Sequence, residues 1–228
     1  MYDLNKVIVA LDTPDDEKAM ALVKILKKHI EVFKVGLELF CSAGPNIVKN
    51  INNEGCKVFL DLKFHDIPNT VAGAARAAAN TGAFMFNVHT SGGKNMMNKA
   101  VEAAKQTGLK PYVLGVTVLT SMDDDDLVDL NITKNTLNQA VCLAKLAKSS
   151  GLDGVVASPK EIAAIRNELG SDFLIVTPGV RPSWAETFDQ KRVMTPAAAL
   201  DAGADFIVVG RPITASKDPI QALKKLFI

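Results

Sequence analysis

Short apolar runs rich in β-branched residues alternate with helical patterns along the whole of this chain. Eight such runs are predicted strands, and they span Val7–Asp12, Val32–Glu38, Cys56–Leu60, Phe84–His89, Tyr112–Thr120, Gly154–Ser158, Phe173–Gly179 and Phe206–Pro212. The eight predicted helices cover about 13–29, 44–53, 69–79, 96–106, 136–148, 159–170, 195–203 and 219–226. Strict alternation requires parallel strands joined by right-handed crossovers. Eight units in 228 residues predict an α/β fold, a closed (β/α)8 TIM barrel.

A doubly wound open sheet is the alternative architecture. A dinucleotide-binding sheet of that kind carries Gly-x-Gly-x-x-Gly after its first strand, whereas Thr13-Pro14 follows the first strand here. No linker or low-complexity tail divides the sequence, so we predict a single domain over residues 1–228. Two long connections, 121–135 and 180–194, interrupt the regular pattern. We expect the four aspartates at 123–126 to be a solvated loop.

The composition narrows the class of protein. Hydrophobic residues make up 48% of the chain and charged residues 22%, which is enough for a full core. A net charge of +1 argues against a general nucleic-acid or membrane-surface binder. Three cysteines, Cys41, Cys56 and Cys142, show no zinc-ligand spacing and fit reduced thiols. With no signal peptide and no apolar run of about 20 residues, the sequence predicts a soluble cytoplasmic protein.

Charged side chains gather at the end of the predicted third strand. Asp61 and Lys63 stand two residues apart, so they point to the same side of that strand, and Asp66 follows in the next loop. Lys34 interrupts the apolar run of the second strand, and burying it in an apolar layer would cost too much free energy. We therefore expect Lys34 to face the barrel mouth and to meet Asp61. An ordinary solvated ion-pair cluster is the alternative interpretation.

Polar residues at other strand ends indicate the second half of a site, because these ends and the loops after them form the active sites of (β/α)8 barrels. Gly179, Gly210 and Arg211 follow the seventh and eighth strands, where glycine backbone N–H groups and an arginine fit a phosphate. The other polar residues at such ends are Asp12, His89, Thr120 and Arg181. We assign no role to His89 or His65. The pattern predicts metal-free chemistry on a phosphorylated small molecule, with a lysine as proton donor or charge stabiliser.

The stretch Asp61-x-Lys63-x-x-Asp66-Ile67-Pro68-Asn69-Thr70 resembles the signature of the orotidine 5′-phosphate decarboxylase family. Further matches in the same order are Leu11-Asp12-Thr13-Pro14, Phe33-Lys34-Val35-Gly36, Asn87-Val88-His89, Val118-Leu119-Thr120-Ser121, Thr177-Pro178-Gly179-Val180-Arg181-Pro182, Asp189-Gln190-Lys191-Arg192 and Val209-Gly210-Arg211-Pro212. The resemblance covers essentially the whole chain and is to the shorter bacterial branch.

The resemblance implies roles for individual residues. It implies that Lys63 protonates C6 of the pyrimidine after carbon dioxide leaves, and that Lys34, Asp61 and the partner subunit's Asp66 complete a charged array. It implies contacts of Asp12 and Thr70 with the ribose, and of Thr120 with the pyrimidine edge. The phosphate ligands that it implies are Arg181, Gln190, Gly210 and Arg211. It further implies a homodimer, with sites at the interface, that converts orotidine 5′-monophosphate to uridine 5′-monophosphate without a cofactor or metal. The connection 180–194 is the expected lid over that site.

Two rival functions remain open at this stage. Sister barrels share the Asp-x-Lys-x-x-Asp pattern and act as magnesium-dependent sugar-phosphate decarboxylases or aldolases, but they carry a glutamate at the position of Lys34. A non-catalytic barrel that binds phosphorylated ligands is the second rival, and adjacent buried carboxylates argue against it. One departure from the family lies at 183–188, Ser-Trp-Ala-Glu-Thr-Phe, where bacterial members usually carry a glycine-containing segment. This departure bears on Gln190 and on closure of the site.

Overall fold

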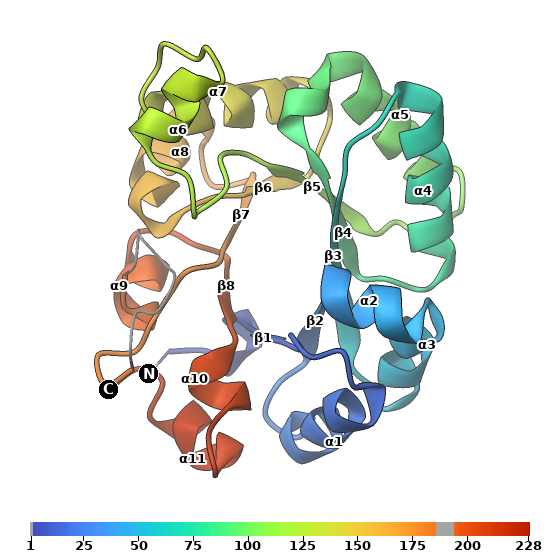
Figure 1. Ribbon diagram of the computed structural model, residues 1–228, viewed down its shortest axis with the longest axis vertical. Helices are drawn as coiled ribbons and strands as arrows, with labels where there is room; N and C mark the ends of the chain where they lie inside the picture. The colour runs from blue at the N-terminus through green and yellow to red at the C-terminus, as the bar shows by residue number, and fades with distance from the viewer. Residues whose placement is uncertain (1, 186–193) are drawn as a thin grey trace.

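In the computed structural model, which describes residues 2–185 and 194–228, eight parallel strands close into a barrel and helices surround it (Figure 1). The strands are β1 (Val7–Ala10), β2 (Val32–Gly36), β3 (Lys57–Phe64), β4 (Met85–His89), β5 (Tyr112–Val116), β6 (Gly154–Val156), β7 (Leu174–Thr177) and β8 (Phe206–Val209). Each strand pairs with the next one in sequence, and β8 pairs back with β1. The predicted (β/α)8 barrel is confirmed, and the open-sheet alternative is wrong.

The helices are more numerous than the sequence pattern predicted. Within the described residues they are α1 (Asp16–Leu26), α2 (Leu37–Ala43), α3 (Asn46–Asn53), α4 (Pro68–Asn80), α5 (Gly93–Lys105), α6 (Asp124–Asp129), α7 (Thr136–Ser149), α8 (Ile162–Leu169), α9 (Pro196–Asp201), α10 (Arg211–Thr214) and α11 (Pro219–Lys224). Three short 3₁₀ helices in the same ranges are η1 (Leu4–Lys6), η2 (Thr90–Gly92) and η3 (Pro159–Glu161). The prediction of eight helices is therefore wrong. None of these helices combines the length and apolar character that a membrane span requires.

Six predicted strands, the first, second, fifth, sixth, seventh and eighth, were too long at their carboxyl ends. The second ends at Gly36, and α2 begins at Leu37, whereas the eighth ends at Val209 and is followed by α10. In both cases the chain turns into a helix at the end of the strand, and the predicted strand ran on into the first residues of that helix. An apolar run by itself does not distinguish a buried strand from the helix that follows it.

The aspartate run is a helix start rather than a plain loop, which corrects the prediction for 123–126. Asp123 caps α6, because its Oδ1 accepts the N–H of Asp126 at 3.2 Å while Asp126 Oδ2 accepts the N–H of Asp123 at 2.8 Å. Acidic side chains in a first turn also complement the partial positive charge of a helix N-terminus. Leu127 on this helix is buried against Val118 and Ala140, which fixes α6 on the barrel.

The core has two parts because strand side chains alternate between the inside and the outside of the barrel. The inner cluster takes one or two residues from each strand, such as Ile8, Val32 and Phe59. The outer, larger cluster lies between the strands and the helices and includes Phe33 and Val35 of β2. Val32 and Lys34 thus point inward while Phe33 and Val35 point outward. This alternation brings a lysine to the mouth of the barrel directly above an apolar layer.

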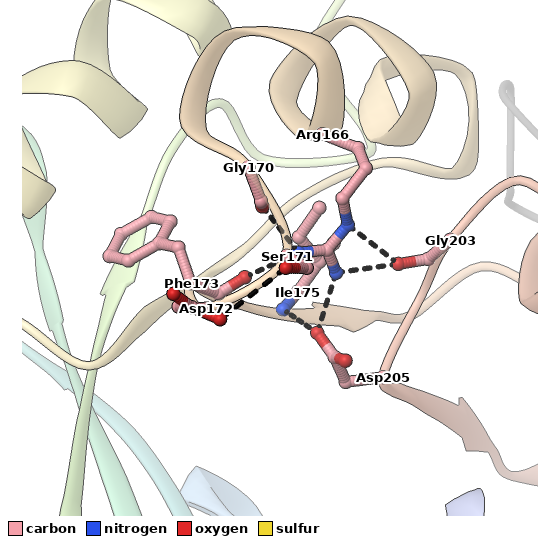
Figure 2. A network of polar contacts seen from close by, with 8 residues as sticks. All are labelled: Arg166, Gly170, Ser171, Asp172, Phe173, Ile175, Gly203 and Asp205. Carbon is pink, nitrogen blue, oxygen red and sulfur yellow. Dashed lines mark hydrogen bonds and ion pairs between the residues drawn. The ribbon is translucent and has the colours of Figure 1, made fainter.

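The opposite, N-terminal end of the barrel is held by one arginine (Figure 2). Arg166 of α8 donates from Nε and Nη2 to the carbonyl of Gly203, and from Nη1 to the carbonyls of Gly170 and Phe173. Its Nη2 also lies 2.7 Å from Asp205 Oδ2, and the same oxygen accepts the N–H of Ile175 at 2.7 Å. Arg166 therefore ties α8 to the starts of β7 and β8.

Candidate active site

A cavity of about 490 Å³ opens at the carboxyl ends of the strands. Its floor consists of apolar side chains of the inner core, including Ala10, Phe59 and Val156. The predicted site residues that line it are Asp12, Lys34, Asp61, Lys63, Thr120, Arg181, Gly210 and Arg211, together with Gly179. The fold thus gathers residues from distant parts of the sequence around one cavity. This location agrees with the general position of active sites in such barrels.

Lys34 lies between two carboxylates. Its Nζ is 2.7 Å from Asp12 Oδ1 and 3.4 Å from Asp61 Oδ2. Burial, the largest single influence, lowers the pKa of Lys34, but the charges of Asp61 and Asp12 outweigh it, and the net pKa is raised. Gly36 makes room for this arrangement, because a Cβ at that position would stand 2.9 Å from Lys34 Nζ and 3.4 Å from Asp12 Oδ1. Lys34 is therefore a fixed positive charge at the mouth, as its place in the apolar run predicted.

Asp61 is the most enclosed charge of the group, with only 9% of the residue exposed. Its Oδ1 is 2.8 Å from Lys63 Nζ and accepts a hydrogen bond from Asn87 Nδ2 at 2.7 Å. Burial raises the pKa of Asp61, but the charges of Lys34 and Lys63 and the hydrogen bonds from Lys63 and Asn87 lower it below its ordinary value. Asp61 is thus held as a carboxylate inside the cavity by two lysines.

Lys63 has an unusual backbone conformation. Its φ is +53°, in the left-handed region, and the pairing of β3 with β4 shifts register between Leu60 and Phe64. A residue other than glycine in this region carries strain that the surrounding structure must hold in place, and such residues concentrate at functional sites. The alternation rule predicted that Asp61 and Lys63 share a side, and their contact confirms it. The rule did not predict the bulge that aims Lys63 at Asp61.

Asn87 is a site residue to which the sequence reasoning gave no role. It stands in β4, is fully buried, and contacts both Asp61 and the backbone of Lys63. The signal that would have found it is the one that found Lys34, a strongly polar side chain inside an apolar strand, here Met85-Phe86-Asn87-Val88.

The other side of the cavity carries the glycines and arginines that follow the last two strands. Gly179 has a φ of +78°, which favours glycine at that position, and Gly210 and Arg211 begin α10 directly after β8. The guanidinium of Arg181 is largely buried, and its Nη1 donates to the carbonyl of Val180 at 2.9 Å. Arginine side chains beside glycine backbone N–H groups suit an anion such as a phosphate.

Two predicted site residues do not reach this cavity within one chain. Asp66 and Thr70 are both exposed, and Asp66 Oδ1 accepts the N–H of its neighbour Ile67 at 2.6 Å. Neither residue belongs to the cavity lining. The structure therefore does not bring Asp66 to Lys34, Asp61 and Lys63 of its own chain.

Part of the predicted lid lies outside the described residues. Gln190 and the rest of 186–193 belong to that part. The two ends of the connection meet, since the N–H of Arg181 donates to the carbonyl of Met194 at 2.9 Å. Ser183 Oγ and Trp184 Nε1 donate to the carbonyls of Ile228 and Lys225, at 3.0 Å each. The described part of the departing segment thus rests on the C-terminal end of the chain.

His65 and His89 lie beside the site. Their ring centroids are 5.4 Å apart, and burial, His65 and Lys63 together lower the pKa of His89. Among the described residues, no group of three or more histidine, cysteine, aspartate or glutamate side chains is arranged to hold a metal ion. The positive charges at the mouth are those of lysine and arginine side chains.

Fold and site together define a (β/α)8-barrel enzyme whose cavity is lined by lysine–aspartate pairs and by two arginines. The chain belongs to the orotidine 5′-phosphate decarboxylase / HUMPS family, whose description matches residues 5–226. It is 50% identical to an orotidine 5′-phosphate decarboxylase from Hydrogenovibrio crunogenus over 97% of this chain and 94% of the relative. It is also 50% identical to one from Syntrophomonas wolfei over 99% of this chain and 98% of the relative. A crystal structure of orotidine 5′-phosphate decarboxylase from Lactobacillus acidophilus superimposes with a TM-score of 0.84 at 40% identity, covering 97% of each chain.

Proposed function

We propose that this chain decarboxylates orotidine 5′-monophosphate to uridine 5′-monophosphate, the last step of pyrimidine nucleotide synthesis, with Lys63 as the proton donor. The main observation behind this proposal is the buried Asp61 carboxylate, which lies between Lys34 and Lys63 in the cavity at the barrel mouth. The family match and the relatives that share half of its residues support the same reaction.

The proposed chemical step breaks the bond between C6 and the carboxylate carbon of the substrate. The electron pair of that bond remains on C6 as carbon dioxide leaves, and the ammonium group of Lys63 then transfers a proton to C6. The neutral amine left behind regains its proton from water. A positive charge fixed beside C6 stabilises the carbanion, and we take this as the main catalytic term. Asp61 would face the leaving carboxylate, and its charge raises the pKa of Lys34 and so keeps that lysine charged.

Binding is proposed to rest on the far side of the cavity. Arg181, Gly210, Arg211 and Gln190 would hold the 5′-phosphate, and Thr120 would contact the pyrimidine edge. Asp12 and the partner's Thr70 would contact the ribose. A distant phosphate supplies binding energy that positions the pyrimidine over Lys63, and it can also hold a lid closed. No cofactor or metal takes part in this scheme.

The proposed enzyme is a homodimer in which each site receives Asp66 from the other subunit. Asp66 is exposed and separate from the array of its own chain, and its neighbour Ile67 is a large apolar residue with 68% exposure. Mixing Lys63→Ala with Asp66→Ala protein tests this arrangement, because a mixed dimer has one site with both residues intact. Random exchange of subunits should restore about one quarter of wild-type activity. Recovery of no activity in a mixture shown to exchange subunits would contradict the shared site.

The reaction itself is tested by adding orotidine 5′-monophosphate to the wild-type protein in excess chelator and following the loss of orotate absorbance. We expect rapid loss that magnesium does not change. Turnover that requires magnesium, or turnover of a sugar phosphate instead, would support the sister-barrel rival. Tight binding of the nucleotide without turnover would support a binding protein. We place the enzyme in the cytoplasm, which is consistent with the free thiols of Cys41, Cys56 and Cys142.

A further inference from the structure

The pairing of β3 with β4 contains a bulge, and Asn87 is the single residue that β4 places opposite it. The register pairs Leu60 with Phe86 and then Phe64 with Val88, so residues 61 to 63 on β3 lie opposite Asn87 alone. Lys63 takes its left-handed conformation at this bulge. Its N–H donates to Asn87 Oδ1 at 2.7 Å instead of to a strand carbonyl. The asparagine side chain therefore supplies the acceptor that the interrupted strand pairing removes.

The other end of the same amide binds the carboxylate. Asn87 Nδ2 donates to Asp61 Oδ1 at 2.7 Å, and Lys63 Nζ lies 2.8 Å from that same oxygen. A backbone N–H only donates and an ionised carboxylate only accepts, so these two partners fix which way the amide points. The contacts form a closed ring that runs from the backbone of Lys63 through Asn87 and Asp61 to the ammonium group of Lys63.

We infer that Asn87 is the positioning residue for the proton donor. It holds the strained backbone of Lys63 from one side and the carboxylate that Lys63 contacts from the other, and it is itself fully buried. Loss of either contact lets the ammonium group move relative to the reacting carbon. A misplacement of about 1 Å in a catalytic group reduces turnover by about 100-fold. This inference rests on the proposed function and names what keeps its central lysine in place.

The informative variant is Asn87→Asp, which keeps the size and the acceptor but replaces the donor with a second carboxylate. Two carboxylates in contact share one proton, and the apparent pKa of the pair is raised. The ionisable groups around the pair are Lys63 on β3, Lys34 on β2 and His89 on β4, while the paired residue of β5 is Leu114. A protonated Asp at 87 donates to Asp61 as the amide does. Activity should therefore be low above the apparent pKa and return as the pH falls through it.

The matched control is Thr90→Val. Thr90 is fully buried at the start of η2, directly after the same strand, and its Oγ1 donates to the carbonyl of Val116 at 2.6 Å. Asn87→Leu serves as a second variant, which removes both contacts without adding a charge. For all of them kcat, KM and the melting temperature are measured between pH 5 and 9 and expressed per folded molecule.

We expect Asn87→Asp and Asn87→Leu to lose about 100-fold in kcat at pH 8 with KM changed less than about threefold, because the phosphate contacts remain. Only Asn87→Asp should recover in acid, and Thr90→Val should stay close to wild type. If both Asn87 variants keep kcat within about twofold of Thr90→Val, or if the loss follows the melting temperature without recovery in acid, Asn87 is merely structural. Absence of turnover in the wild type would instead refute the proposed function.

Discussion

The two ends of the barrel each contain a cluster of charges, and the two clusters are built differently. At the N-terminal end every N–H of the Arg166 guanidinium has a partner, and four of its five hydrogen bonds go to neutral carbonyls. At the mouth Lys34 is shared by two carboxylates, and Asp61 is shared by two lysines. Figure 2 shows the first cluster as a closed network that connects backbone segments.

The difference indicates what each cluster is for. The network of Arg166 converts a charge into backbone contacts and so fixes how α8 meets β7 and β8. The mouth cluster instead concentrates alternating charges around an open cavity, with a left-handed lysine and a buried carboxylate. Such an arrangement is a poor way to stabilise a fold, because desolvation offsets most of the gain from charge pairing. We therefore expect changes at the mouth to affect turnover, and changes around Arg166 to affect stability.

Apart from the loss of Lys63 itself, the largest effect is expected from Asp61→Ala. Removing the carboxylate that both lysines share should lower kcat/KM by about 10³-fold, the scale of losing one preorganised electrostatic contact. Burial would then act on Lys34 with only Asp12 to oppose it, so its raised pKa should fall and the alkaline limb of the pH–rate profile should move to lower pH. Asp12→Ala is the milder comparison, because the side chain of Asp12 is 58% exposed. Equal losses in both variants would contradict a special role for Asp61.

A smaller effect, on stability instead of turnover, is expected from Arg166→Ala. The change removes the guanidinium from Asp205 and from three backbone carbonyls, and should cost about 3 kcal/mol of unfolding free energy. Chemical denaturation measures this, with kcat per folded molecule unchanged. Lys145→Ala is the control. Lys145 of α7 forms a surface ion pair, at 2.6 Å, with Glu168, which lies on α8 as Arg166 does. Surface ion pairs of this kind contribute less than about 1 kcal/mol. A loss of turnover in folded Arg166→Ala protein would contradict the claim that the Arg166 cluster affects stability and the mouth cluster affects turnover.

Gly36→Ala sharpens the same distinction with a single methyl group. The added Cβ would press on Lys34 Nζ, the end of a flexible side chain, so the fold should adapt while the pair with Asp12 shifts. We expect a loss of about tenfold in kcat/KM with little change in melting temperature. Gly73→Ala in the exposed face of α4 meets no neighbouring atom and should stabilise the protein by up to about 1 kcal/mol. Full activity in Gly36→Ala would show that this packing does not matter.

The smallest effect concerns pH and His89. Its pKa in the folded protein is lowered, so the unfolded chain binds the proton more tightly and stability falls as the pH drops from about 7 through the folded pKa. His89→Gln should remove this part of the acid loss, which we place at about 1 kcal/mol or less because the ring is only half-buried. Melting temperatures between pH 7 and 5 measure the slope. An unchanged slope in His89→Gln would assign the acid loss to other groups.

Much of this molecule could be predicted from its sequence, for identifiable reasons. Eight apolar runs separated by helical patterns leave few parallel folds, and the desolvation of Lys34 in such a run leaves only the barrel mouth for its side chain. The bulge at Lys63 could not be predicted, because it depends on pairing with β4 and not on residues near Lys63 in the chain. The role of Asn87 was missed although the desolvation argument that placed Lys34 applies equally to this polar side chain within the apolar run of β4. The helix at Asp124–Asp129 was missed because four adjacent acids indicate a solvated loop until a capping pair is considered.

Other predictions stay predictions. The single-domain assignment is one of them. The homodimer and the roles of Asp66, Thr70 and Gln190 depend on contacts that one chain, described over residues 2–185 and 194–228, does not contain. The mixed-dimer experiment addresses the homodimer and the role of Asp66 together.

The most direct measurement is the turnover of orotidine 5′-monophosphate by Lys63→Ala, taken beside the wild type at equal concentrations of folded protein. We expect the variant to lose about 10⁴-fold in kcat, because it lacks both the proton donor and the charge beside C6. Its melting temperature should stay within about 2 °C of the wild type, since the side chain is partly exposed and Asp61 keeps Lys34 and Asn87. Turnover equal to that of the wild type would mean that Lys63 is not the catalytic lysine and that the charged mouth has another purpose.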